Sequence, residues 1–171
     1  MSVSPERRET RERLVREHME SENDQEFDRT MATFHHPRYE LIATNEVHDG
    51  EEAVARYFEE TRSAFPDQRN ELIALHHADD AVIAEFWLRG THEGELMGFE
   101  PTGRAFECQC VAFFLFEEDR LVCERVYFDT GTILRQLGIA RDPTSVGGRA
   151  LTVLNHPLTV GRALARQVTG R

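Results

Sequence analysis

Apolar residues occupy every second position along four segments in the second half of the chain. These segments are residues 69–77, 81–92, 105–117 and 120–128. A period of two is typical of β-strands, and the short acidic stretches at 79–80 and 117–119 suit hairpin connections. The alternation therefore predicts an antiparallel meander of four strands.

The third of these strands, 105–117, is apolar on both faces. One face carries Phe106, Cys108, Cys110, Ala112, Phe114 and Phe116, and the other carries Val111, Phe113 and Leu115. A sheet with two apolar faces has to be covered on both sides. The chain's own helices supply one cover, and a second subunit is the economical candidate for the other. We therefore expect a homodimer.

Most of the predicted helices precede the meander. The pattern favours helices at residues 5–21, 24–34 and 49–65, with a further short helix at 130–137. Asp49 and Glu52 have the spacing of a capping box, and Pro66 ends the third helix. Together with a short strand at 39–43, this order predicts an α+β domain whose helices cover one side of the sheet.

The composition narrows the possible functions. Of the 171 residues 40% are hydrophobic, and no apolar run approaches the roughly 20 residues that span a bilayer. The net charge of −11 argues against a nucleic-acid partner held through its phosphates. All twenty basic residues are arginine, which excludes Schiff-base and P-loop lysine chemistry. The charged N-terminal segment has no signal-peptide core, so we expect a cytoplasmic protein.

No cofactor or metal site is evident in the sequence. Motifs of the Walker A, GxGxxG, HExxH, paired CxxC and nucleophile-elbow types are missing. The odd number of cysteines, Cys108, Cys110 and Cys123, predicts reduced thiols. A metal site would need a histidine as fourth ligand, and small core residues are the favoured interpretation of these cysteines.

Charge divides the chain into two parts. Residues 1–140 carry 15 arginines and 30 acidic residues, a net charge of −15, whereas residues 141–171 carry five arginines and one aspartate, a net charge of +4. We expect a body at 1–140 and a basic tail, with a linker at 141–149 and a short amphipathic helix at 157–168. The tail could dock on an acidic protein surface or bind a membrane surface. Docking is favoured, because one short segment binds membranes weakly.

The best candidate for chemistry is Asp129, which follows the last strand and precedes the 130–137 helix. Alternation places Arg125 and Tyr127 on the same face as Asp129. Burial beside aromatic rings would raise the pKa of this carboxyl group, and a nearby guanidinium would lower it. Such a carboxylate could take a proton from a carbon next to a carbonyl and return it. The structural alternative is that Asp129 caps the following helix, and both roles can hold together.

The strand 81–92 offers further candidates. Glu85, Trp87 and Arg89 share one of its faces. Trp87 is therefore either the wall of a pocket or a half-buried core or interface residue. His92 ends the strand, where it could reach the mouth of a pocket.

Two segments resemble the SnoaL-like polyketide cyclases, also called ester cyclases, of the NTF2-like superfamily. Residues 90–104, GTHEGELMGFEPTGR, are similar to the family loop GTHxGxxMGxxPTGR, and residues 128–138, FDTGTILRQLG, are similar to the ending FDxxxxxRQLG. The resemblance implies a curved antiparallel sheet wrapped around a conical cavity that N-terminal helices close. It also implies homo-oligomers and no cofactor.

The same resemblance implies an intramolecular aldol condensation that closes a ring, with the acid/base aspartate at Asp129. A partner histidine of the family falls near Phe114, and an aromatic residue of the family falls on Arg125. We therefore predict a cofactor-free acid/base enzyme that acts on a small apolar, oxygen-bearing molecule by aldol-type cyclisation or related proton transfer. Besides Asp129, the predicted substrate-binding residues are Arg125, Tyr127, Trp87, His92 and Tyr39.

Two other functions fit the same sequence. One is a non-catalytic module that binds a small molecule. The other is an enzyme that activates water, as an epoxide hydrolase does, with Glu85 and with Arg89 or Arg125 facing the same water.

Overall fold

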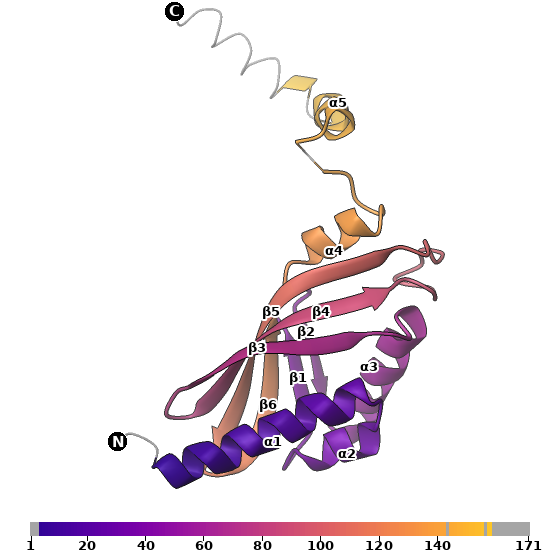
Figure 1. Cartoon of the computed structure of the whole chain (residues 1–171). Coiled ribbons are helices and arrows are strands. Elements are labelled where there is room, and N and C mark those ends of the chain that lie inside the picture. The colour runs from indigo at the N-terminus through magenta and orange to yellow at the C-terminus, as the bar shows by residue number, and fades with distance from the viewer. Residues whose placement is uncertain (1–3, 143, 156, 159–171) are drawn as a thin grey trace, which may run out of the picture.

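A six-stranded sheet with strand order β2-β1-β6-β5-β4-β3 forms the centre of the molecule (Figure 1). The computed structural model describes residues 4–142, 144–155 and 157–158. The helices are α1 (Pro5–Asn23), α2 (Phe27–Ala32), α3 (Glu51–Ala64), α4 (Thr130–Gln136) and α5 (Val146–Asn155). The strands are β1 (Arg38–Leu41), β2 (Glu46–Asp49), β3 (Arg69–His77), β4 (Ala81–Thr91), β5 (Ala105–Glu117) and β6 (Arg120–Tyr127).

Strands β3 to β6 form the antiparallel meander that the alternation predicts. Strand β1 joins this meander parallel to β6, with Tyr39 opposite Glu124, and β2 pairs with β1 in the antiparallel direction. The sheet is therefore mixed: the predicted antiparallel meander is confirmed, and the pairing of β1 with β6 adds one parallel pair. Strand β2 was outside the prediction because its four residues are exposed or half-buried and have no apolar face.

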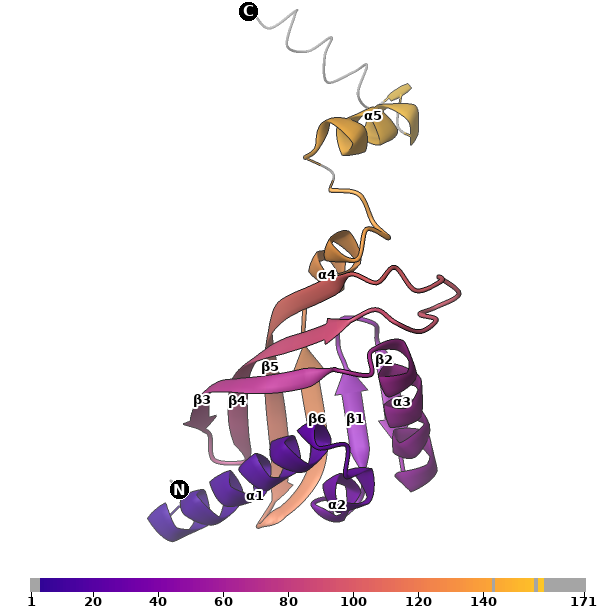
Figure 2. The same ribbon diagram turned by 45° about the vertical axis from the view of Figure 1, so that its right-hand side comes forward.

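Helices α1, α2 and α3 lie against the concave face of the curved sheet, and α4 lies at the end of β5 and β6 (Figure 2). The core fills the space between these two layers. It includes Val15 of α1 and Phe58 of α3, which pack with Phe86, Phe106 and Phe114 of the sheet. This arrangement confirms the predicted α+β class, with N-terminal helices on one side of the sheet.

The two faces of β5 differ in burial as the alternation predicts. The six residues from Phe106 to Phe116 on the inner face are buried, whereas Val111, Phe113 and Leu115 are only half-buried. On neighbouring strands, Ile73 is 48% exposed and Tyr127 is 42% exposed. The outer face of the sheet is thus an apolar surface that the described part of the chain covers incompletely.

The start of α3 differs from the prediction. Its N-cap is Gly50, with a φ of 89°, and no side chain caps the helix. A positive φ favours glycine, because a Cβ atom would strain this conformation. Asp49 instead accepts hydrogen bonds from His36 (2.7 Å) and Arg38 (2.6 Å). The predicted capping box is therefore not formed.

The C-terminal segment also departs from the prediction. Helix α5 begins at Val146, inside the predicted linker. The predicted helix at 157–168 lies outside the described residues, apart from Pro157 and Leu158. Within the described ranges, no helix combines the length and apolar character that crossing a membrane requires.

Candidate functional site

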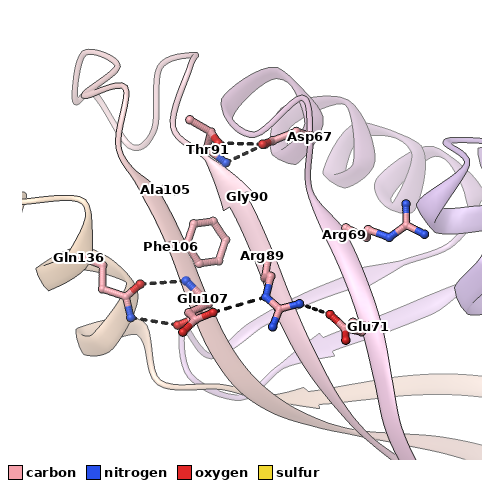
Figure 3. A pocket seen from close by; sticks show the side chains of 10 residues that line it. All are labelled: Asp67, Arg69, Glu71, Arg89, Gly90, Thr91, Ala105, Phe106, Glu107 and Gln136. Atoms are coloured by element: carbon pink, nitrogen blue, oxygen red, sulfur yellow. Dashed lines mark hydrogen bonds and ion pairs between the residues drawn. The ribbon is translucent and has the colours of Figure 1, made fainter.

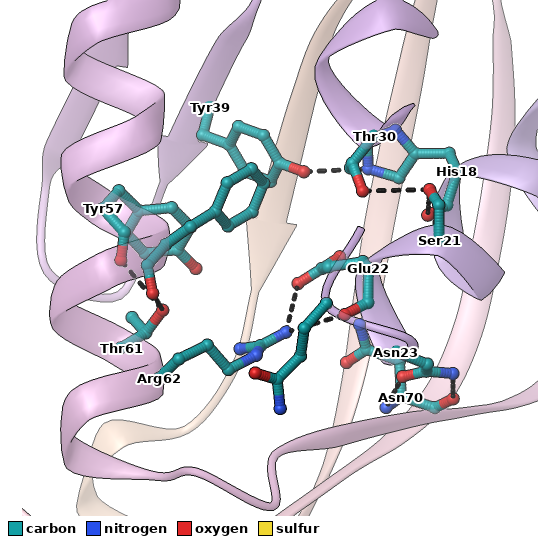
Figure 4. A network of polar contacts seen from close by, with 12 residues as sticks. His18, Ser21, Glu22, Asn23, Thr30, Tyr39, Tyr57, Thr61, Arg62 and Asn70 are labelled. Carbon is teal, nitrogen blue, oxygen red and sulfur yellow. Dashed lines mark hydrogen bonds and ion pairs between the residues drawn. The ribbon is translucent and has the colours of Figure 1, made fainter. Parts of the chain in front are cut away.

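Five ionisable side chains from four elements meet inside the layer between helices and sheet. His18 and Glu22 come from α1, Tyr39 from β1 and Arg62 from α3 (Figure 4). The fifth residue, Glu124, comes from β6. Each of them is less than a tenth exposed. We call this group the interior cluster. Charged residues are rarely buried unless they are paired, so the cluster is the most unusual feature of the core.

The local sequence explains why these side chains point inward. In α1 the buried positions Arg11, Val15, His18 and Glu22 follow at steps of four, three and four, which is one face of a helix. Arg62 lies on the face of α3 that also carries Val54 and Phe58. The parallel pairing of β1 with β6 sets Tyr39 beside Glu124.

Hydrogen bonds fix the orientation of the His18 ring. The Thr33 hydroxyl donates to the carbonyl oxygen of Thr30 at 2.6 Å, so its oxygen has to accept the bond from His18 Nδ1 at 2.7 Å. The hydrogen on Nδ1 is therefore committed to Thr33. The other ring nitrogen, Nε2, faces the hydroxyl of Tyr39 at 2.8 Å and Oε2 of Glu124 at 3.0 Å.

In this geometry two hydrogen-bond acceptors, on His18 and Glu124, compete for the hydroxyl hydrogen of Tyr39. Neutral His18 would accept at Nε2, and ionised Glu124 would also accept, but Tyr39 has a single hydroxyl hydrogen to donate. Oε2 of Glu124 is buried and lies within ion-pair distance of Nε2, without a well-aligned hydrogen bond to any described residue. Tyr39 can therefore satisfy only one of the two acceptors, and the interior cluster is one hydrogen short of complete bonding.

A second carboxylate and a cation complete the cluster. Glu22 Oε1 lies 3.2 Å from Nη2 of Arg62. Burial, followed by the charge of Glu124, raises the pKa of Glu22, and Arg62 and His18 oppose this change. Burial also raises the pKa of Tyr39 far above its usual value, with a further contribution from Glu124. Tyr39 is thus held as a protonated hydrogen-bond donor.

The same atoms have the composition of a metal site. Ligand atoms of His18, Glu22 and Glu124 lie within 4.8 Å of one another. However, Arg62 already supplies one positive charge to the two carboxylates. A divalent cation would leave a net positive charge in the interior, which is costly. With Arg62 in place, the donor set therefore suits a divalent metal poorly.

Asp129 lies in a different environment from the one expected. It occupies the N-cap position of α4, its side chain is 62% exposed, and it accepts a hydrogen bond from Thr132. That bond is the main reason why the pKa of Asp129 is lowered, and Arg135 at 3.5 Å contributes. Asp129 therefore does not lie in the apolar pocket that the sequence led us to expect. It stands at the N-cap position of α4, but its side chain makes no capping hydrogen bond.

The expected neighbours of Asp129 point to the outer side of the sheet. Arg125 donates to Glu40 at 2.6 Å, and Tyr127 makes an edge contact with Phe113, with 5.6 Å between the ring centroids. The alternation along β6 was right, but the choice of inner face was reversed. The inner side carries Glu124. Polar residues occur on both faces of β6, so polarity alone could not identify the inner face.

Trp87 also lies on the outer face, half-buried, with the guanidinium of Arg89 5.6 Å from its ring. Arg89 pairs with Glu71 and Glu107, and Glu85 pairs with His76. The set proposed for water activation is therefore dispersed, because its members are engaged in separate ion pairs.

A groove of about 400 Å³ opens on this outer side, near the ends of β3, β4 and β5 (Figure 3). Gln136 of α4 bridges its edge by bonding both the N–H and the carbonyl oxygen of Glu107, at 2.8 and 2.9 Å. Asp67 accepts hydrogen bonds from the N–H and the hydroxyl group of Thr91, at 2.6 and 2.7 Å. Most polar groups of the groove are thus used in contacts with one another.

His92 and Tyr39 both point inward. His92 is fully buried and accepts the N–H of Thr102 at 3.2 Å, which ties down the ends of the 92–104 loop. It does not stand at an open pocket mouth. Tyr39 belongs to the interior cluster, where it is 1% exposed.

Sequence reasoning missed His18, Glu22, Arg62 and Glu124. The signal was present for the first two, since they share a helical face with Val15. Phe114, where the resemblance leads one to expect a histidine, makes an edge contact with the His18 ring, with 5.3 Å between the centroids. An imidazole therefore does lie beside this position, but it comes from α1.

Known structures define the class of the fold. A protein from Catenulispora acidiphila, described as having a ketosteroid isomerase-like fold, matches with a TM-score of 0.63 at 14% identity, over 81% of this chain and 96% of the other. A putative polyketide cyclase from Xanthomonas campestris pv. campestris matches with a TM-score of 0.70 at 17% identity, over 77% and 98%. The fold is thus of the NTF2 and ketosteroid isomerase type.

The sequence is more specific than the fold. Residues 12–137 match the SnoaL-like polyketide cyclase family, and the chain belongs to that family. A relative from Streptomyces galilaeus, aklanonic acid methyl ester cyclase AcmA, is 30% identical over 127 residues, which cover 72% of this chain and 88% of the relative.

Proposed function

We propose that the protein is a cofactor-free acid/base enzyme that closes a ring in a small, apolar, oxygen-bearing substrate by an aldol-type reaction or a related proton transfer. The observation that carries this proposal is the pairing of two bases, His18 Nε2 and Glu124 Oε2, around the single hydroxyl hydrogen of Tyr39. Family membership and the ester cyclase from Streptomyces galilaeus support it.

In the proposed reaction, the Glu124 carboxylate removes a proton from a carbon next to a substrate carbonyl. The electron pair of that C–H bond forms an enolate, whose oxygen replaces His18 Nε2 as the acceptor of the Tyr39 hydroxyl hydrogen. The enolate carbon then attacks a second carbonyl carbon of the same molecule and forms the new C–C bond. The resulting alkoxide takes the proton back from Glu124, so the enzyme ends as it began.

The local environment supports these roles. Burial keeps Tyr39 protonated, and a donor fixed before the reaction stabilises developing charge without reorganising. His18 lies close enough to Glu124 to stabilise it in either protonation state. Tyr57, half-buried beside Tyr39 with 5.4 Å between the rings, provides an aromatic surface next to these groups.

Asp129, with Arg125 and Tyr127, is the alternative assignment of the base and its neighbours, and the family resemblance favours it. Its exposure and lowered pKa make it a weaker base than a buried carboxylate. Glu124→Gln and Asp129→Asn separate the two assignments, because both changes preserve shape and remove the charge.

The test is turnover of a panel of aromatic polyketide methyl esters, with circular dichroism to check folding. We expect Glu124→Gln to lower kcat by about 10²- to 10⁴-fold, the usual contribution of a general base, and Asp129→Asn to change it little. The reverse result would transfer the role to Asp129. Binding of the esters without turnover by the unaltered protein would instead support a non-catalytic binding module, which the close packing of the interior cluster also fits.

The outer face of the sheet supports a homodimer. Phe113, Leu115 and Tyr127 form part of an apolar surface that is half-buried or exposed in one chain. A second copy would cover it, and stable interfaces of this kind bury about 1,200–2,000 Å². Sedimentation at micromolar concentration should show a dimer that Phe113→Glu dissociates. A monomer before the substitution would contradict the dimer.

The free thiols of the three buried cysteines fit a reducing compartment such as the cytoplasm.

A further inference from the structure

Arg62 uses only part of its hydrogen-bonding capacity. Its Nη2 contacts Glu22, at 3.2 Å from Oε1 and 3.4 Å from the backbone oxygen. Its Nε and Nη1 are buried and have no hydrogen-bond partner among the described residues. The guanidinium lies above the Phe27 ring, with Cζ 5.5 Å from its centroid. A side chain that is 6% exposed thus retains unused donors.

Such donors are expensive to leave unpaired. A buried polar group without a partner loses its bonds to water and gains none in return, so nearly all such groups in native proteins have a partner. Glu22 does not meet this demand, since it contacts one nitrogen only. The spare N–H groups of Arg62 therefore need an acceptor that the described part of the chain does not supply.

The surroundings of Arg62 suit an aromatic ligand. Phe27 stacks on Phe58, with 4.6 Å between the ring centroids. Tyr57 follows, with 5.7 Å between its ring and that of Phe58. Phe27 and Tyr57 are half-buried, whereas Phe58 is buried, so only the two outer rings of this wall reach the surface. A planar molecule against these rings would bring an oxygen-bearing group toward Arg62.

We infer that Arg62 is the anchor for an anionic oxygen group of the substrate, a carboxylate or an enolate carried on an aromatic ring. This inference rests on the proposed function and names its substrate class. The unpaired Nε and Nη1 each offer an N–H to an anionic oxygen, and such charge-assisted hydrogen bonds are stronger than neutral ones. Glu124 would then act on a carbon of the same molecule farther along the interior.

Binding of such an anion is coupled to a proton. The groups facing Glu22 are His18 on its own helix, Arg62 and Tyr57 on α3, Tyr39 on β1 and Glu124 on β6. An anion bound at Arg62 pairs with the guanidinium, whose positive charge otherwise stabilises ionised Glu22. Glu22, whose pKa burial already raises, then binds a proton, and the complex gains no net buried charge.

The experiment measures binding of 2-naphthoate and of its neutral isostere 2-naphthamide to the full chain by calorimetry at pH 7, in two buffers of different ionisation enthalpy. We expect naphthoate to bind more tightly than naphthamide, with uptake of about one proton. Glu22→Gln removes the competitor for Arg62. It should strengthen naphthoate binding by roughly tenfold and abolish the proton uptake.

Loss of Arg62 is tested in the double variant Glu22→Gln with Arg62→Gln. This variant removes both charges of the ion pair, so that neither is left buried without its partner. It should lose the preference for naphthoate and keep its affinity for naphthamide. Equal binding of the two compounds by the unaltered protein would overturn the inference, as would an unchanged preference in the double variant. Because these readouts are binding constants, inactivity of the enzyme toward esters would contradict the proposed function without altering them.

Discussion

Replacing Arg62 by glutamine would leave Glu22 as a buried carboxylate without its cation. The two side chains are 6% and 7% exposed, so solvent screens the pair weakly. Removal of one partner from a buried ion pair costs about 3–5 kcal/mol. At about 2–4 °C per kcal/mol for a domain of this size, this corresponds to a fall in Tm of roughly 6–20 °C.

The loss should depend on pH. The pKa of Glu22 is raised above its usual 4.5 in the folded protein, so folding favours its protonated form. Such a group does not destabilise the fold below its unfolded pKa, and it destabilises the fold progressively as the pH rises through its folded pKa. Arg62→Gln removes one of the influences that lower this pKa. The variant should therefore be close to the unaltered protein near pH 4.5 and show its full loss at pH 8.

Urea unfolding followed by circular dichroism at pH 5 and pH 8 measures this difference. The matched control is the double variant Glu22→Gln with Arg62→Gln, which should regain most of the stability at pH 8. An equal loss at both pH values would refute the reasoning. It would show that Arg62 stabilises the fold through its packing on Phe27 rather than through its charge.

Two further substitutions test the interior cluster. Thr33→Val removes the acceptor of the His18 Nδ1 hydrogen and should cost about 1–3 kcal/mol in urea unfolding. Thr33→Ser should cost clearly less, and equal losses would show that the methyl group matters rather than the hydroxyl. Glu22→Leu combined with Arg62→Met replaces the ion pair by apolar side chains. It should leave stability unchanged or raise it by about 1–4 kcal/mol, and a loss of similar size would assign the pair a structural role.

The sequence predicts the framework because the framework rests on local periodicity. Strands β3 to β6 follow from alternation, and the burial of β5 agrees residue by residue. Strand β2 has no apolar face. It forms only through its pairing with β1, so its own residues show no alternation from which a strand could be predicted. The parallel pairing of β1 with β6 joins segments about eighty residues apart, and periodicity carries no information about such contacts.

The interior cluster escaped prediction for a different reason. On α1 the inward face was chosen by its apolar residues, so the polar His18 and Glu22 were not considered. On β6 the face with Arg125 and Tyr127 was taken as the inner one, which left Glu124 on the other side. Burial follows from position on the element, not from residue type alone. On β6 the two faces have similar polarity, and only the pairing with β1 determines that Glu124 points inward.

The arrangement of the cluster argues for a functional origin. Two carboxylates, an imidazole and a guanidinium occupy positions on three elements where apolar residues would pack without desolvation cost. A purely structural ion pair would satisfy its members, yet Arg62 and Glu124 both keep buried atoms without a hydrogen bond in the described chain. Unsatisfied, charged groups concentrated in the core are what a protein retains when a substrate completes them. This incomplete bonding, more than the charges themselves, supports the roles proposed for Glu124 and Arg62.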